Sequence, residues 1–311
     1  MISPERIVIA TRESRLALWQ AEHVRALLRQ LYPACSVELL GMTTRGDQIL
    51  DRPLAKVGGK GLFVKELETA LLDGSADIAV HSMKDVPMEL PPEFALVATG
   101  PRELPLDAFV SSRYASLDDM PPGAVVGTSS LRREAQLHAN HPSLAVTSLR
   151  GNLDTRLRKV AEGQYDAIVL AAAGLKRLGW EDRIAEILPL ETMCPAVGQG
   201  ALAIETRQDG GDGQQACAIL DHLPTRLAVT AERAVLAELG GGCQVPIGAH
   251  AVVDGARIRL RAVVVSPDGS ILIRREVEGS AAEGARLGAE LARELLDAGG
   301  QEILESVYGP R

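Results

Sequence analysis

Cationic side chains lie in four short segments, each of which follows a run of residues typical of a β-strand. The segments are ATRES (10–14), HSMKD (81–85), GTSSLRR (127–133) and LRGNLDTR (149–156). Open α/β sheets bind ligands at the carboxyl ends of their strands, and arginine forms paired hydrogen bonds with carboxylate or phosphate. Each segment alone is equally consistent with a charged residue on a solvated helix face. Together they predict a cleft for a polyanionic ligand.

The third of these segments combines several groups that attract anions. Thr128, Ser129 and Ser130 place hydroxyl and backbone N–H groups at the start of a predicted helix. The positive end of the helix dipole favours negative charge at such a position. Arg132 and Arg133 follow within the first turn and add guanidinium donors. The segment therefore predicts an anion-binding helix start.

A glycine-rich loop with two lysines, AKVGGKGLF (55–63), leads into another predicted helix. Its spacing does not fit the nucleotide P-loop, which ends in Gly-Lys-Ser/Thr. Lys56, Lys60 and Phe63 are compatible with a plain surface loop. They are equally compatible with a lid that brings two cations and one aromatic ring over a ligand.

Asp85 is an acidic residue in these cationic surroundings, directly after Lys84. Neighbouring positive charge favours the ionised carboxylate. A fixed carboxylate in a cleft can stabilise a developing positive centre and relay protons. A structural ion pair is the alternative, and it is the commoner role for a single acidic residue.

Cys243 differs from the other cysteines in its surroundings, because it follows the glycines Gly240–Gly242. A permissive backbone allows a thiol to reach outward. This setting favours an attachment or nucleophilic role, although a lone cysteine is usually a small core residue. Cys35, Cys194 and Cys217 fit that ordinary role.

Two similar runs of strands and helices would position these segments. The first comprises a strand at 7–11, a helix at 14–32 with Ser14 as its N-cap, a strand at 37–42, a helix at 61–73 and a strand at 78–81. The second comprises strands at 125–128, 146–149 and 167–171, helices at 131–139 and 153–162, and helical pieces at 175–178 and 183–187. Alternating strands and helices predict mainly parallel sheets. The proline-rich stretch 87–105 and the turn and strand at 195–206 would be the crossings between two domains, which predicts a ligand cleft between them.

The last part of the chain has a different pattern. A helix at 225–239 precedes strands at 247–253, 257–265 and 271–277, which are separated by the turn signals Asp254-Gly255 and Pro267-Asp268-Gly269. A helix at 281–298 follows. Hairpin strands packed by helices predict a small α+β domain.

The bulk properties exclude several classes of protein. A net charge of −8 argues against a nucleic acid or an anionic membrane as the partner. No apolar run approaches the ~20 residues needed to cross a bilayer, and the first residues show no signal-peptide pattern. The cysteines form no CxxC pair and have no histidine at ligand spacing. We therefore expect a cytoplasmic protein without a metal ion.

The chain resembles the porphobilinogen deaminase family over nearly its whole length. The motifs that carry the resemblance are PLAKVGGKGLFVKELE (53–68), AVHSMKDVP (79–87), GTSSLRR (127–133), LRGNLDTRL (149–157), AAAGLKRLG (171–179), PAVGQGALAIE (195–205) and GGGCQVPIGAH (240–250). Together these motifs are highly specific. The weakly matching parts are residues 208–215 and the last helix.

The resemblance implies an α/β fold with two domains like type II periplasmic binding proteins and a smaller α+β C-terminal domain. Domain 1 would comprise residues 1–100 and 201–218, with the catalytic aspartate and the flexible loop. Domain 2 would comprise residues 106–195 and bind cofactor and substrate through its arginines. Domain 3 would comprise residues 223–311 and carry the cysteine for cofactor attachment.

The resemblance also implies a transferase of heme and tetrapyrrole biosynthesis. A dipyrromethane cofactor would be joined to Cys243 by a thioether. Four porphobilinogen molecules would condense on it with loss of ammonia, and hydrolysis would release hydroxymethylbilane. Asp85 would assist loss of ammonia and stabilise the resulting azafulvenium cation. A cytoplasmic monomer is expected.

The implied binding residues supply positive charge and hydrogen bonds to acetate and propionate groups. The cofactor would contact Lys84, Ser82, Thr128, Ser129, Arg132, Arg133, Arg150 and Arg156. The substrate would contact Arg12, Ser14, Arg150, Arg156, Arg177 and Gln199. Lys56, Lys60 and Phe63 would lie on the mobile loop.

Two other functions compete with this interpretation. A two-lobed solute-binding or effector-sensing module would explain the anion cleft, but it predicts a secretion signal or a DNA-binding segment and gives Cys243 no role. A phosphate-transfer enzyme would use the glycine-rich loop, but no carboxylate-rich magnesium motif accompanies that loop.

Overall fold

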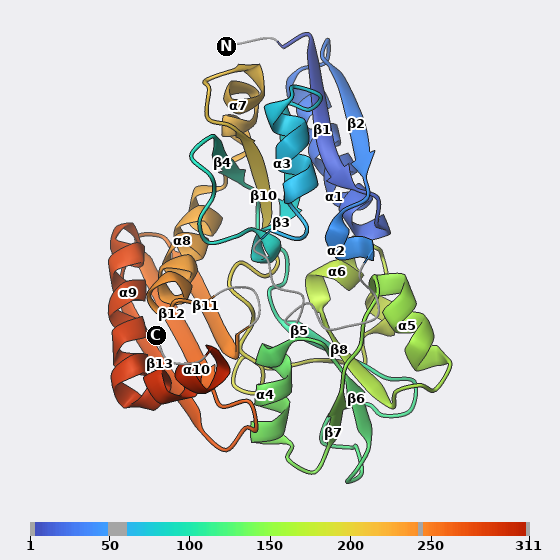
Figure 1. The fold of residues 1–311 in the computed structure, drawn as a ribbon, viewed down its shortest axis with the longest axis vertical. Helices are drawn as coiled ribbons and strands as arrows, with labels where there is room; N and C mark the ends of the chain where they lie inside the picture. Colours follow the sequence, from blue (N-terminus) through green and yellow to red (C-terminus); the bar gives the residue numbers. More distant parts are fainter. Residues whose placement is uncertain (1–3, 49–60, 242–244, 309–311) are drawn as a thin grey trace. The chain divides into compact units, whose positions relative to one another are not determined.

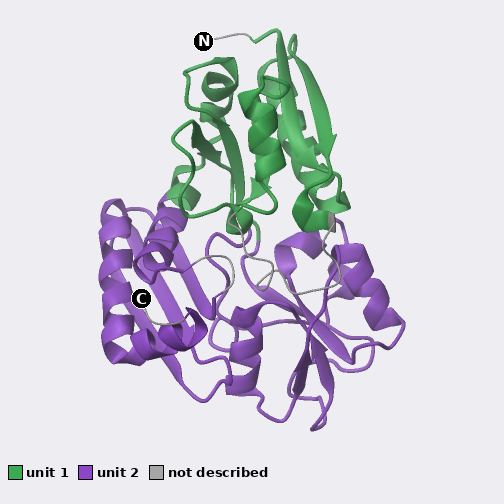
Figure 2. Cartoon of the chain, viewed as in Figure 1, with its two compact units in different colours: residues 1–103, 201–226 green, residues 104–200, 227–311 purple. Residues whose placement is uncertain are grey.

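The computed structural model describes residues 4–48, 61–241 and 245–308. The chain divides into two compact units, residues 1–103 with 201–226 and residues 104–200 with 227–311 (Figure 2). Lys56, Lys60 and Cys243 lie outside the described residues. No helix in the described part is long and apolar enough to cross a membrane.

The first unit is built on a five-stranded sheet in the order β2-β1-β3-β10-β4 (Figure 1). The strands are β1 (Arg6–Arg12), β2 (Ser36–Met42), β3 (Ile78–Ser82), β4 (Phe94–Thr99) and β10 (Leu202–Arg207). β1 runs parallel to β2 and β3, whereas β10 is antiparallel to both of its neighbours. The sheet is therefore mainly parallel, as expected, because β1, β2, β3 and β4 share one direction and β10 runs in the opposite one.

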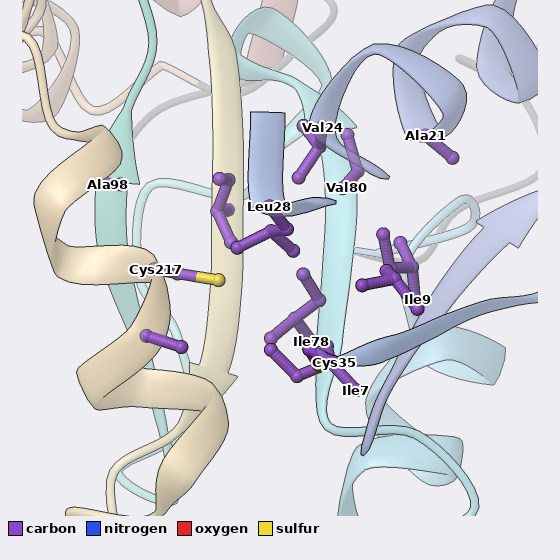
Figure 3. Close-up of a cluster of buried hydrophobic side chains, with 13 residues drawn as sticks. Ile7, Ile9, Ala21, Val24, Leu28, Cys35, Ile78, Val80, Ala98 and Cys217 are labelled. Atoms are coloured by element: carbon purple, nitrogen blue, oxygen red, sulfur yellow. The ribbon is translucent and has the colours of Figure 1, made fainter. Parts of the chain in front are cut away.

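Helix α1 (Arg15–Leu31) forms where the sequence predicts it. Ser14 is its N-cap, since its hydroxyl accepts a hydrogen bond from the backbone N–H of Ala17 at 3.3 Å. Apolar residues at helical spacing place Val24 and Leu28 against the strand residue Ile78 (Figure 3). The other helical elements of this unit are α2 (Arg45–Gln48), α3 (Lys65–Leu72), η2 (Met83–Asp85), α7 (Asp212–Cys217) and η4 (Ala218–Leu220).

The second unit repeats this sheet topology in the order β7-β6-β8-β5-β9. Its strands are β5 (Asp107–Val110), β6 (Val125–Gly127), β7 (Ala145–Thr147), β8 (Ala167–Ala171) and β9 (Glu186–Ile187). β6 is parallel to β7 and β8, and β5 is antiparallel to β8. The expectation of two similar α/β domains is confirmed.

The helices of this sheet are α4 (Leu131–Asn140), α5 (Leu153–Ala161), α6 (Ala172–Arg177) and the single 3₁₀ turn η3 (Glu181–Arg183). The expected helical piece at 183–187 is wrong. Ile184 leaves the 3₁₀ turn in an extended conformation, and the next residues pair with β5 as β9. A second correction concerns 87–105, which contains the strand β4 in addition to connecting segments.

The C-terminal part of the second unit is a three-stranded antiparallel sheet with helices, as expected. It comprises β11 (Ile247–Asp254), β12 (Arg257–Val265) and β13 (Leu272–Ser280), with α8 (Leu223–Glu238), η5 (Ala281–Glu283), α9 (Gly284–Leu295), η6 (Leu296–Gly300) and α10 (Gln301–Tyr308). Gly288 lets α9 lie close to α8, because a Cβ there would be 2.3 Å from the carbonyl oxygen of Ala231. The helix expected at 281–298 is present as η5, α9 and the start of η6, and Gly299, with a φ of 105°, breaks it just after the expected end. The helix α10 that follows was not expected.

Candidate active site

Predicted residues of the first unit meet in a pocket at the carboxyl ends of β1 and β3. Arg12, Ser14, Phe63, Ser82 and Asp85 all line this pocket, which has a volume of about 60 Å³. The parallel direction of the two strands brings their carboxyl ends to the same edge of the sheet. The topology therefore explains how segments far apart in the sequence come together.

Asp85 is held at the end of the short 3₁₀ turn that follows β3. The backbone N–H of Met83 donates to the carbonyl of Ala201 at 3.0 Å, and Met83 is buried. The N–H of Val86 closes the turn on the carbonyl of Met83 at 3.2 Å. These bonds fix the backbone on either side of Asp85, whose side chain is partly exposed and lines the pocket.

Arg12 is oriented by a carboxylate and an aromatic ring. Its Nε donates to Oδ2 of Asp47 at 3.0 Å, and its guanidinium carbon lies 4.2 Å from the ring centroid of Phe63. Gly46 makes room for this ring, since a Cβ there would lie 2.3 Å from it. Burial would raise the pKa of Asp47, but hydrogen bonds from Arg12 and Thr44 and the charge of Arg12 lower it below its ordinary value.

Gln20 is a pocket residue that sequence reasoning missed. It is 3% exposed, and its amide donates to the hydroxyl of Ser82 at 2.9 Å. The signal was present, because an amide on the buried stripe of an amphipathic helix needs a hydrogen-bond partner. The contact fixes Ser82 in the lining of the pocket.

His81 is a second missed residue of the pocket. Its Nε2 lies 2.8 Å from Oε2 of Glu205, and the two side chains are 4% and 0% exposed. Glu205 also affects Glu68, whose pKa is raised by burial and by the negative charge of Glu205. The His81–Glu205 pair ties β3 to β10 beneath the pocket.

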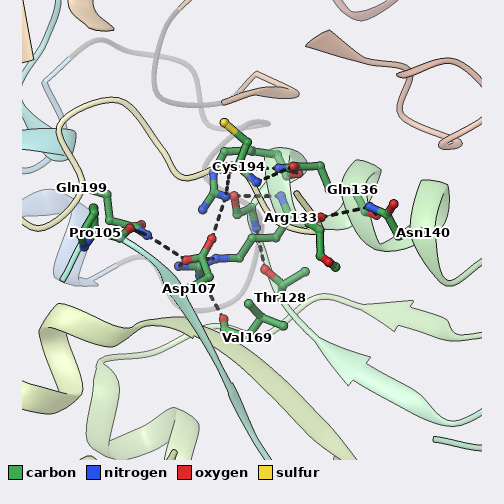
Figure 4. Close-up of polar contacts among 12 residues, drawn as sticks. Pro105, Asp107, Thr128, Arg133, Gln136, Asn140, Val169, Cys194 and Gln199 are labelled. Atoms are coloured by element: carbon green, nitrogen blue, oxygen red, sulfur yellow. Dashed lines mark hydrogen bonds and ion pairs between the residues drawn. The ribbon is translucent and has the colours of Figure 1, made fainter. Parts of the chain in front are cut away.

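In the second unit, several of the predicted residues donate hydrogen bonds to Asp107, a buried acidic residue that was not predicted. Asp107 is 0% exposed and accepts hydrogen bonds from Arg132, Arg133 and Gln199 (Figure 4). Burial would raise the pKa of Asp107, but the charges and hydrogen bonds of Arg132 and Arg133 hold it well below its ordinary value. Gln199 also donates to the carbonyl of Pro105 at 2.6 Å.

The remaining predicted residues of this unit lie around the starts of α4 and α5 and at the end of α6. Thr128 is buried and accepts from the N–H of Ser130 at 3.2 Å, and Ser129 donates to the carbonyl of Leu149 at 2.6 Å. These contacts join two of the four cationic segments. Of the other arginines, Arg156 donates to the carbonyl of Gly151, Arg177 donates to that of Gly200, and burial lowers the pKa of Arg150.

The arginine pair fits an acidic group. Among the described residues, one carboxylate, that of Asp107, lies within hydrogen-bond distance of the two guanidinium groups of Arg132 and Arg133. Nε of Arg132 is buried and has no hydrogen-bond partner among those residues. A buried donor and a surplus positive charge both favour an anion. In the described part of the chain, no group of His, Cys, Asp and Glu side chains could hold a metal ion.

Two family models together match most of the chain. Residues 7–215 match the family model "Porphobilinogen deaminase, dipyromethane cofactor binding domain", and residues 226–297 match "Porphobilinogen deaminase, C-terminal domain". A porphobilinogen deaminase of Ralstonia nicotianae is 61% identical over 98% of this chain and 92% of its own. One of Chromobacterium violaceum is 57% identical over 97% of this chain and 98% of its own. A solved structure of the methionine-binding protein MetQ covers 70% of this chain and 90% of its own, with 15% identity and a TM-score of 0.45.

Proposed function

This chain belongs to the porphobilinogen deaminase family, and we propose that it joins four porphobilinogen molecules into hydroxymethylbilane with loss of ammonia. It is a transferase of tetrapyrrole biosynthesis. The observation that carries the proposal is the pocket in which one carboxylate, Asp85, lies with the cation Arg12 and the hydroxyl of Ser82. Porphobilinogen carries an aminomethyl group and two carboxylates, which are the complementary groups.

Asp85 is the proposed catalytic residue. When ammonia leaves the aminomethyl carbon, the pyrrole that remains is a cation, and a preorganised carboxylate stabilises it. The same carboxylate can accept the proton that the joined pyrrole carbon loses. The backbone bonds at Met83 and Val86 support this role, because they fix the turn from which the Asp85 side chain enters the pocket.

Binding of the acid groups is assigned to the cationic residues of both units. Arg12 and Ser14 would bind the substrate in the first unit, with Ser82 and Lys84 assigned to the cofactor. Ring stacking by Phe63 supports the position of Arg12. The residues proposed for the cofactor and substrate in the second unit are Thr128, Ser129, Arg132, Arg133, Arg150, Arg156, Arg177 and Gln199.

The dipyrromethane, when bound, supplies the nucleophilic pyrrole carbon to which the first substrate is joined. We propose Cys243 as its thioether attachment point, on the sequence motif alone, since this residue lies outside the described ones. Val245 and Pro246 follow it and lead directly into β11, so the attachment point would precede a strand whose N-terminal half is buried.

The activity test incubates the purified chain with porphobilinogen and measures ammonia release together with porphyrin formed after acid cyclisation and oxidation of the product. The proposal expects both, in a ratio of about four ammonia molecules per porphyrin by the stoichiometry of a tetrapyrrole. Binding of porphobilinogen without ammonia release would favour a solute-binding module instead.

The cellular setting and assembly also belong to the proposal. The substrate is a small molecule, and the net charge of −8 gives no support for a nucleic acid or an anionic membrane as partner. We propose a cytoplasmic monomer with the three domains given above. Cell fractionation and analytical ultracentrifugation test the location and the assembly.

A further inference from the structure

Two short segments of the first unit are bonded to each other: the helix α2 and the turn at residues 61–64 that leads into α3. The backbone N–H of Gly46 donates to the carbonyl of Leu62 at 2.9 Å. The N–H of Arg45 donates to Oε1 of Glu66, in the first turn of α3, at 3.0 Å. One backbone bond and one side-chain bond therefore hold α2 against the start of α3.

Gly46 also lies directly against the ring of Phe63. A Cβ at this position would be 2.3, 2.5 and 2.8 Å from three carbon atoms of the ring, whereas carbon atoms in ordinary contact are about 3.5–4.0 Å apart. The φ of Gly46 lies outside the left-handed region, so the nearest obstacle to an alanine here is the ring. We call this contact, together with the two hydrogen bonds, the α2–α3 contact.

Each side of the α2–α3 contact carries one group that touches Arg12. On α2, Oδ2 of Asp47 accepts from Nε of Arg12 at 3.0 Å, and the N–H of Asp47 is itself bonded to the carbonyl of Thr44 at 3.0 Å. Before α3, the ring centroid of Phe63 lies 4.2 Å from the guanidinium carbon. The α2–α3 contact therefore sets the distance between the two groups that orient Arg12.

We propose that Gly46 and Glu66 are positioning residues for Arg12, because they fix Asp47 and Phe63 relative to each other. Neither residue lines the pocket, whereas Arg12 does. An arginine side chain loses much rotamer freedom when its guanidinium is held, so holding it before the ligand arrives favours binding of an acid group. The inference rests on the proposed function and deepens it, since it names residues that set how the substrate is bound.

The first test replaces Gly46 and measures steady-state kinetics of the cofactor-loaded enzyme with porphobilinogen. Gly46→Ala should displace the ring and raise KM about fivefold, the size expected for a partly exposed ion pair, with kcat within about twofold of the wild type. Gly100→Ala is the matched control, because a Cβ there meets nothing within 4 Å. Melting temperatures of both variants show whether they are folded.

A double-mutant cycle shows whether the effect passes through the ring. In a Phe63→Ala background the added methyl group has room, so Gly46→Ala should change KM by less than about twofold. The same fivefold change in both backgrounds would overturn the role of Gly46.

Glu66 is tested by a pair of variants, which also decides the matter if Gly46→Ala does not fold. Glu66→Ala removes the acceptor for the N–H of Arg45 and should raise KM, whereas Glu66→Gln keeps an oxygen that can accept this bond and should bind nearly as the wild type does. Equal KM values for Glu66→Ala and the wild type would overturn the role of Glu66.

The titration of Asp47 gives a measurement that does not depend on activity. Burial raises the pKa of Asp47, and hydrogen bonds from Arg12 and Thr44 with the charge of Arg12 lower it below its ordinary value. If Gly46→Ala displaces Arg12, the pKa of Asp47 should rise, as followed by NMR of protein with ¹³C-labelled aspartate, with Asp47→Asn identifying the signal. An unchanged pKa of Asp47 in Gly46→Ala would overturn the proposal. A wild-type enzyme that releases no ammonia would instead refute the proposed function, so the two failures are distinguishable.

Discussion

Asp47 occupies the side-on edge of the Arg12 guanidinium: Nε donates to Oδ2 at 3.0 Å, and Nη2 pairs with Oδ1. Thr44 donates its hydroxyl to the same Oδ2 at 2.7 Å, which fixes the carboxylate. Because Asp47 holds this edge, Nη1 is, among the contacts of the described residues, the Arg12 donor that remains for a ligand. Asp47 therefore orients Arg12 rather than competing for it.

Asp47→Asn should raise KM for porphobilinogen with little change in kcat. An ion pair of this partial exposure contributes about 1 kcal/mol, or roughly fivefold in KM. Steady-state kinetics measure the effect, and Asp182→Asn, at a side chain 77% exposed, is the matched control. A lower KM in Asp47→Asn would mean that Asp47 competes with the substrate for Arg12.

Asp85→Asn should retain the covalent adduct yet lose turnover. An amide keeps the shape of the carboxylate but not its charge, so the cation formed on loss of ammonia is no longer stabilised. We expect a fall in kcat of about 100-fold or more. Asp118→Asn, at a side chain 90% exposed, is the control, and full activity of Asp85→Asn would remove Asp85 from the mechanism.

Gly248→Ala should destabilise the C-terminal sheet of the second unit. A Cβ at this position of β11 would lie 2.8 Å from the carbonyl oxygen of Cys194 and 3.0 Å from its Sγ. Overpacking of this kind costs about 1–3 kcal/mol. Denaturant unfolding measures the loss, and Gly100→Ala serves as control because a Cβ there meets nothing within 4 Å. Equal stability of the two variants would contradict the close packing.

The decrease in the free energy of unfolding at acid pH should depend on Asp107. Its folded-state pKa is depressed, so its contribution is complete above the unfolded value of about 3.9 and is lost as pH falls below it. Asp107→Asn should lower stability at pH 7 by about 3 kcal/mol or more, since it leaves two arginines unneutralised. The Asp107→Asn substitution should also make the loss of stability below pH 4 less steep. Unfolding at several pH values tests this, and a parallel decline in both proteins would contradict it.

Local patterns predicted most of the strands and helices. The N-cap at Ser14 was predicted because a hydroxyl preceded an apolar stripe, and the structure confirms it. The stripe itself placed Val24 and Leu28 in the core. The short helix α10 after Gly299 was not predicted, because eight residues give too little periodicity to indicate a separate helix.

The pairing of strands and of charged residues that are far apart in the sequence could not be predicted from local patterns. The strand β5 is only four residues long and begins with the charged Asp107, so it has no strand pattern of its own. The Asp107 carboxylate can be buried because Arg132 and Arg133, on helix α4, neutralise its charge. The direction of β10 was missed for a related reason, since strand direction depends on the route of the chain rather than on local spacing.

The intact mass of the purified chain tests the covalent attachment of the cofactor most directly. When the protein is made in cells that synthesise porphobilinogen, its mass should exceed the sequence mass by one covalently attached dipyrromethane, and Cys243→Ser should remove the excess. A wild-type mass equal to that of the unmodified sequence, in protein that is folded by its melting curve, would contradict the central claim.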